Sequence, residues 1–126
     1  MNYRPVILLL AAFVMSACDS DPEPDMSIDV VSPPAEGDTS DVSYLVEWTV
    51  TGLSWYESYI DLFADTDTDP SVGQVMIAES LSTESTAWAW ECGLFPEGDY
   101  YIRAVLYEGF NEVDDYSDGV LTIIHY

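Results

Sequence analysis

Apolar and polar residues alternate along most of the chain after residue 27, with the period of two that is typical of half-buried β-strands. The clearest run covers residues 42–50, where valine, tyrosine and tryptophan occupy every second position. No segment shows the 3.6-residue period of an amphipathic helix. The pattern predicts seven short strands of an all-β sandwich or barrel, at residues 28–31, 42–50, 59–64, 74–78, 86–90, 100–107 and 120–124.

The segments between these runs are rich in Pro, Gly, Asp and Ser, the residues that favour turns. The segment from residue 28 to residue 126 is long enough for one hydrophobic core and too short for two. We therefore predict a single domain over residues 28–126. The predicted turns lie at residues 33–38, 52–54, 65–73, 79–85, 93–98 and 108–119.

Residues 1–17 have the parts of an export signal: Arg4, then ten apolar residues, then the small residues Ser16 and Ala17. Ten apolar residues are too few to span a bilayer as a helix, which needs about twenty. The stretch Met-Ser-Ala-Cys that ends at Cys18 resembles a bacterial lipobox, although Met15 stands where leucine is usual. The resemblance implies cleavage before Cys18 and attachment of lipid to it. The alternative is an ordinary secretory signal, with Cys18 as a free thiol.

Residues 18–27 form an acidic segment with prolines that has almost nothing to bury, so we expect an extended tether. Fully extended, the residues after Cys18 reach about 30 Å. A chain anchored in this way lies on a bacterial cell envelope, at the inner or the outer membrane, and is exposed to the periplasm or the exterior.

The charge is strongly one-sided, with 24 Asp and Glu residues against 2 Lys and Arg residues and a net charge of −22. A nucleic-acid surface needs clustered cations, so nucleic acid is excluded as a partner. The hydrophobic fraction of 48% is too high for a disordered acidic tail. We expect a folded monomer that is more stable where salt or calcium screens its acids.

Few residues are available for catalysis. The single histidine, His125, lies at the end of the chain, so a Ser-His-Asp arrangement would depend on a frayed terminus. Cys92 is expected to be a small buried residue, with a reactive thiol as the alternative. Among 24 acids some carboxylates lie close by chance, which gives little support to glycoside hydrolysis. We predict a protein that is not an enzyme.

Residues 94–100 read Leu-Phe-Pro-Glu-Gly-Asp-Tyr, which matches the signature of a tyrosine corner, where Tyr100 bonds an upstream backbone group. With Trp48 in its Val-Glu-Trp motif, the chain resembles a fibronectin type III or related immunoglobulin-like domain over residues 28–124. The resemblance implies a seven-stranded antiparallel β-sandwich that acts in display or adhesion. Two departures are a longer spacing from Trp90 to Leu94 and the acidic stretch 65–69.

Asp65, Asp67 and Asp69 alternate with threonines, as the carboxylates of an EF-hand loop do. Pro70 replaces the required glycine and Met76 replaces the last ligand, so an EF-hand is excluded. A looser calcium site formed by these three aspartates stays a candidate. The alternative is that the segment is a plain solvated turn. We expect no other cofactor.

Trp55 and Tyr56 are candidate binding residues, because a predicted loop exposes large rings only at a cost. Packing of the two rings over the end of the sheet is the alternative. Strands running up and down would place this loop and Phe110 at the tethered pole, and Asp65 to Asp69 at the far pole.

The sequence thus predicts a non-enzymatic binding or structural module of the cell envelope, attached through Cys18, whose partner is an unknown protein or glycan. The alternative is a calcium-dependent module that binds a carbohydrate or another ligand.

Overall fold

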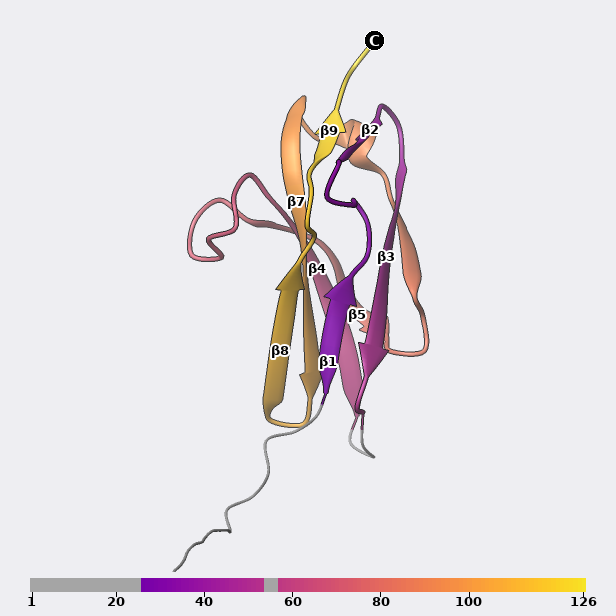
Figure 1. Cartoon of the computed structure of the whole chain (residues 1–126), viewed down its shortest axis with the longest axis vertical. Helices are drawn as coiled ribbons and strands as arrows, with labels where there is room; N and C mark the ends of the chain where they lie inside the picture. The colour runs from indigo at the N-terminus through magenta and orange to yellow at the C-terminus, as the bar shows by residue number, and fades with distance from the viewer. Residues whose placement is uncertain (1–25, 54–56) are drawn as a thin grey trace, which may run out of the picture.

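The computed structural model describes residues 26–53 and 57–126, and these residues form two β-sheets with no α-helix (Figure 1). The smaller sheet has the order β1-β3-β6, with β1 Ser27–Val30, β3 Tyr44–Thr51 and β6 Ala87–Trp90. Both of its strand pairs are antiparallel. The prediction of an all-β fold is confirmed.

The larger sheet has the order β2-β9-β7-β4-β5, and β8 also pairs with β7. The long strands β4 and β7 form its centre, where they pair in register from Ser58 with Glu108 to Asp65 with Tyr101. Its strands are β2 Asp38–Ser40, β4 Ser58–Asp65, β5 Val75–Ser82, β7 Gly98–Glu108, β8 Asn111–Tyr116 and β9 Leu121–Ile123.

Three of these strands differ from the prediction, because β8 and β2 were not predicted as strands and β5 continues to Ser82, four residues into the predicted turn 79–85. Strand β8 lies within the predicted turn 108–119, and β2 begins at Asp38, where another predicted turn ends. The described part of the chain therefore has nine strands instead of seven. The sheets are also not antiparallel throughout, because β2 pairs with β9 in parallel.

Side chains from both sheets form one core. Trp48 and Trp90 from the smaller sheet are buried against Ile60, Leu62 and Ile102 from the larger one. Trp48 is therefore a core residue, as predicted, and Cys92 is also fully buried, in the short 3₁₀ turn η2 Cys92–Leu94.

The predicted tyrosine corner is present. The hydroxyl of Tyr100 donates a hydrogen bond to the carbonyl oxygen of Pro96, at 2.8 Å. Its ring packs edge-on against Phe95 and Trp90, with centroids 5.9 and 6.2 Å away. The corner thus joins the start of β7 to the end of the smaller sheet.

The two ends of the described domain lie at opposite poles of its long axis (Figure 1). We call the pole where β1 begins the N-terminal pole. It also holds the turn from β7 to β8 with Phe110, as the sequence predicted, and Phe110 is fully exposed. The described residues include no helix long and apolar enough to cross a membrane.

Candidate functional site

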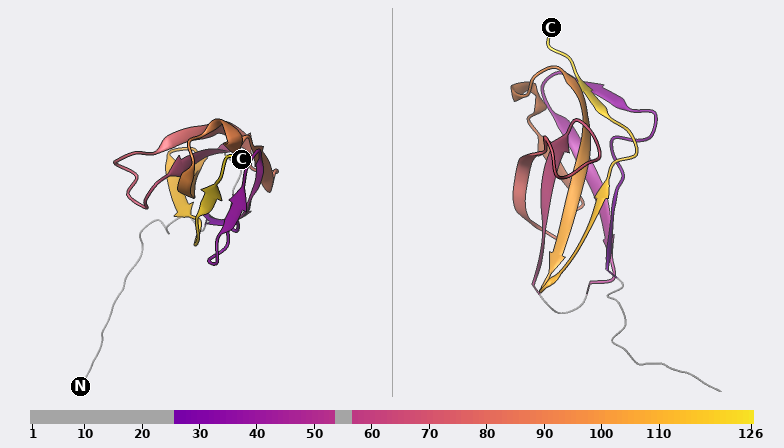
Figure 2. Two further views of the ribbon diagram at one scale, coloured as in Figure 1. Left: turned by 90° about the horizontal axis from the view of Figure 1, so that it is seen from above. Right: turned by 90° about the vertical axis from the view of Figure 1, so that its left-hand side faces the viewer.

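The acidic loop, residues 66–74, follows β4 and projects from the side of the larger sheet instead of from a pole (Figures 1 and 2). It carries two of the three predicted calcium ligands, Asp67 and Asp69, and both are exposed. The third, Asp65, is the last residue of β4 and is 0% exposed. The three carboxylates therefore lie in two different environments.

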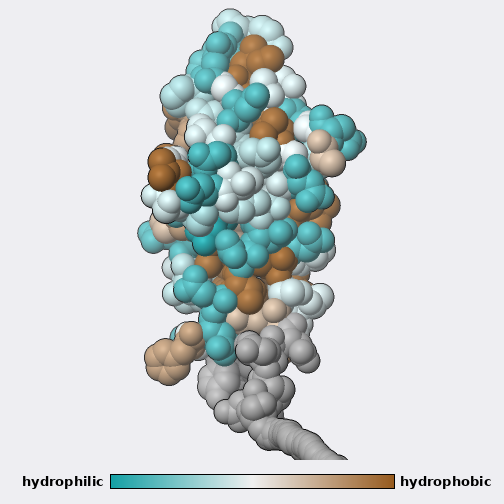
Figure 3. Space-filling view, turned by 60° about the vertical axis from the view of Figure 1, so that its left-hand side comes forward, coloured by the Kyte–Doolittle hydropathy of each residue, from teal (hydrophilic) through white to brown (hydrophobic). Residues whose placement is uncertain are grey.

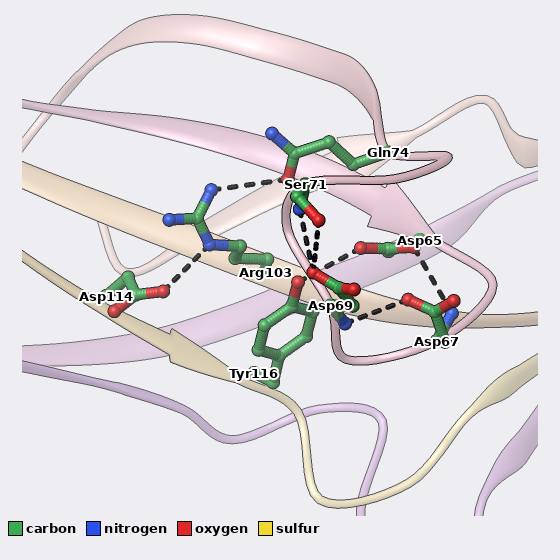
Figure 4. Close-up of polar contacts among 8 residues, drawn as sticks. All are labelled: Asp65, Asp67, Asp69, Ser71, Gln74, Arg103, Asp114 and Tyr116. Carbon is green, nitrogen blue, oxygen red and sulfur yellow. Dashed lines mark hydrogen bonds and ion pairs between the residues drawn. The ribbon is translucent and has the colours of Figure 1, made fainter.

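The exposed carboxylates of this loop fold back onto their own backbone. The N–H of Asp69 donates to Oδ1 of Asp67 at 2.8 Å, and the N–H of Ser71 donates to Oδ1 of Asp69 at 3.0 Å (Figure 4). The hydroxyl of Ser71 adds a second bond to the same oxygen, at 2.7 Å. These bonds are successive Asx turns. The Ser71 hydroxyl and N–H lower the pKa of Asp69.

Asp65 has a structural partner on the neighbouring hairpin. Its Oδ2 accepts a hydrogen bond from the hydroxyl of Tyr116 on β8 at 3.0 Å, and its Oδ1 accepts the N–H of Asp67 at 3.2 Å. Burial, together with the bond to Asp65, raises the pKa of Tyr116 to about 12. Asp65 therefore fixes the root of the acidic loop to β8.

Arg103, the one Arg or Lys of the described residues, fixes the other end of the loop. Its Nε donates to Oδ2 of Asp114 on β8 at 2.8 Å, and its Nη1 donates to the side-chain oxygen of Gln74 at 3.2 Å (Figure 4). The guanidinium also lies 5.6 Å from the ring centre of Phe63. One cation thus holds β4, β7, β8 and the loop together.

The structure does not bring Asp65, Asp67 and Asp69 together as a set of ligands. Across residues 26–53 and 57–126, no group of three or more His, Cys, Asp or Glu side chains is placed to hold a metal ion. The calcium site stays a prediction, and it would require the loop carboxylates to exchange their backbone bonds for the ion.

A stacked aromatic pair lies on the outer face of the larger sheet and was missed by sequence reasoning. Tyr59 on β4 is opposite Tyr107 on β7, and their rings stack at 4.8 Å with 20° between their planes. Tyr59 is 42% exposed. Burial, with the nearby Asp61 carboxylate, raises the pKa of the Tyr107 hydroxyl. Finding this pair required the register of two strands 48 residues apart.

The outer surface over β8 and the acidic loop is mixed in character. Hydrophobic residues form separate small patches among hydrophilic ones on this side of the molecule (Figure 3). The other predicted site residues, Cys18, Trp55 and Tyr56, lie outside the described residues.

Comparison of the chain with protein-family models, with curated proteins and with solved structures finds no match.

Proposed function

We propose that this chain is a non-enzymatic binding or structural module with a fibronectin type III-like fold, anchored by lipid on Cys18 to a bacterial cell envelope. The sequence supports the anchor, because Cys18 directly follows an apolar run and two small residues. The Tyr100 corner and the two-sheet arrangement support the fold.

The observation that carries the proposal is the position of Ser27, the first residue of β1, at one pole of the long axis (Figure 1). A tether that ends there would present the opposite pole, with β2, β9 and the turn η2, away from the membrane. Such a layout suits a module that displays a surface on a stalk. His125 also lies at that far pole and is exposed. Its backbone N–H donates a hydrogen bond to a carboxylate oxygen of Glu97.

Replacement of Cys18 by serine tests the anchor. In its native host, Cys18→Ser should appear as unprocessed or soluble protein, whereas the unchanged chain sediments with membranes. Cys92→Ser is the matched control and should leave fractionation unchanged. Equal membrane fractionation and equal processed mass for Cys18→Ser and the unchanged chain would contradict the proposal.

The second candidate is a calcium-dependent module for a carbohydrate or another ligand, which the exposed loop carboxylates and the stacked Tyr59–Tyr107 pair favour. An ion or ligand that binds only the folded state raises the melting temperature by mass action. Melting curves with calcium and with chelator separate the two candidates. A rise with calcium that Asp67→Asn with Asp69→Asn abolishes would favour the second candidate.

A further inference from the structure

The two sheets are joined along one side and open along the other. On the joined side, the N–H of Val30 on β1 donates to Asp115 on β8 at 2.8 Å. On the open side, within the described chain, β5 pairs only with β4, and β6 pairs only with β3. The outer edge of β6, which lies on the right of β3 in Figure 1, therefore has no neighbouring strand among the described residues.

A groove of about 260 Å³ lies between these two outer strands. Most of its lining is apolar, from Met76 and Ile77 on β5, Trp88 and Trp90 on β6, and Leu94 and Phe95 after β6. Met76 is 46% exposed and Leu94 is 83% exposed. The open side thus presents apolar side chains together with an unpaired strand edge, a combination that favours association with another chain.

The two edges differ in regularity. Strand β6 pairs with β3 without interruption from Ala87 to Trp90. Strand β5 is irregular: Met76 and Ala78 face consecutive residues of β4, which leaves Ile77 as an extra residue, and Ser80 has a positive φ of 56°. Bulges and bends disfavour the addition of a strand, so β5 serves as a wall of the groove and β6 as its template.

We infer that an extended, cationic segment of a partner protein adds to β6 as a fourth strand of the smaller sheet and places apolar side chains in the groove. This mode gives affinity through main-chain hydrogen bonds and selectivity through the alternate side chains. The inference rests on the proposed binding function and names its surface and the class of partner.

Charge decides between the possible occupants. The chain carries 24 acids against 2 cations, and Glu91 lies on the rim of the groove. A second copy would bring the same net charge of −22 into contact, and the chain's own residues 19–25 contain acids and no cation. A segment in which Lys or Arg alternates with apolar residues is complementary to the rim and to the groove.

The probe is the capped peptide Lys-Val-Lys-Val-Lys-Val-Lys. Its control is the same peptide N-methylated on the backbone at every residue, which blocks strand pairing along both edges and keeps the charge of the lysine side chains. Binding to the full chain in detergent is followed through tryptophan fluorescence. Met76→Lys puts a cation into the groove, and Val31→Lys adds the same charge at a matched site, 49% exposed, beside β1.

The unchanged chain should bind the first peptide and not the methylated one. Met76→Lys should weaken binding about tenfold and Val31→Lys by less than about twofold. Equal binding of both peptides, or equal loss in both variants, would overturn the inference. Self-association of the unchanged chain that Met76→Lys abolishes would assign the groove to a second copy and also overturn it. Because this assay does not depend on the lipid, a failure here is distinct from a failure of the Cys18→Ser test.

Discussion

Asp115 on β8 accepts the backbone N–H of Val30 on β1, and this bond joins the edges of the two sheets. Burial raises the pKa of Asp115; the Val30 N–H opposes that rise, and the carboxylates of Asp29 and Asp118 add to it. The folded protein thus holds the Asp115 proton more tightly than the unfolded chain does. The contribution of Asp115 to stability is therefore greatest below its ordinary pKa of 3.8 and is lost as the pH rises through the raised value.

We predict that Asp115→Asn melts at a higher temperature than the unchanged chain at pH 7, because asparagine stays neutral and keeps an oxygen for Val30. The two melting temperatures should converge as the pH falls towards 4. Asp115→Ala, which removes the acceptor, should be less stable than Asp115→Asn by about 1 kcal/mol. If Asp115→Asn instead melted at a lower temperature than the unchanged chain at pH 7, and this difference disappeared at acidic pH, the assigned direction of the pKa shift would be contradicted.

Tyr100→Phe should lower the free energy of unfolding by about 1 kcal/mol, because it removes the hydrogen bond to Pro96. The loss is small because the bond is exposed, so water can take the place of the hydroxyl. The matched control is Tyr101→Phe, since no hydrogen bond of the Tyr101 hydroxyl is seen within the described residues. Urea unfolding measures both changes. Equal losses of unfolding free energy in the two variants would show that the Tyr100 hydroxyl does not stabilise the fold through its bond to Pro96.

Trp48→Ala should cost about 3 to 5 kcal/mol, because it leaves a cavity between the two sheets. Leu45 lies on the same strand but is 50% exposed. Leu45→Ala should therefore change the free energy of unfolding by less than about 0.5 kcal/mol. Denaturant unfolding of the two variants side by side tests which face of β3 is internal. A small loss at Trp48 would mean that the core can collapse around the missing ring.

Sodium chloride should raise the melting temperature. The described domain has Arg103 as its one Arg or Lys, and that side chain is already paired with Asp114. Repulsion among the other acids is therefore relieved mainly by dissolved ions, and the Debye length falls from about 30 Å to about 3 Å between 0.01 and 1 M salt. A melting temperature that is flat or falls over this range would show that the acids do not destabilise the fold.

The alternation of apolar residues was sufficient to find every strand that buries a regular apolar face. Strand β8 escaped because its sequence, Asn-Glu-Val-Asp-Asp-Tyr, is mostly polar. Its two aspartates have partners from elsewhere in the chain, Asp114 in Arg103 and Asp115 in Val30. Val113 packs on the core. Such a strand becomes recognisable only once its neighbours are in place.

The sequence pattern was also insufficient to determine the structure of the candidate site. An aspartate at every second position is the spacing of metal ligands in a loop, and it is also the spacing of successive Asx turns. The structure has the second arrangement at Asp67 and Asp69. In the same way, the Tyr59–Tyr107 stack follows from the register of β4 with β7, which the sequence alone did not determine.

The most direct test of the central claim is the mass of the N-terminal peptide of the protein purified from its native host. An anchored module predicts a chain that begins at Cys18 and carries the added mass of a diacylglyceryl thioether. A chain that begins at another residue, or an unmodified Cys18, would contradict the account.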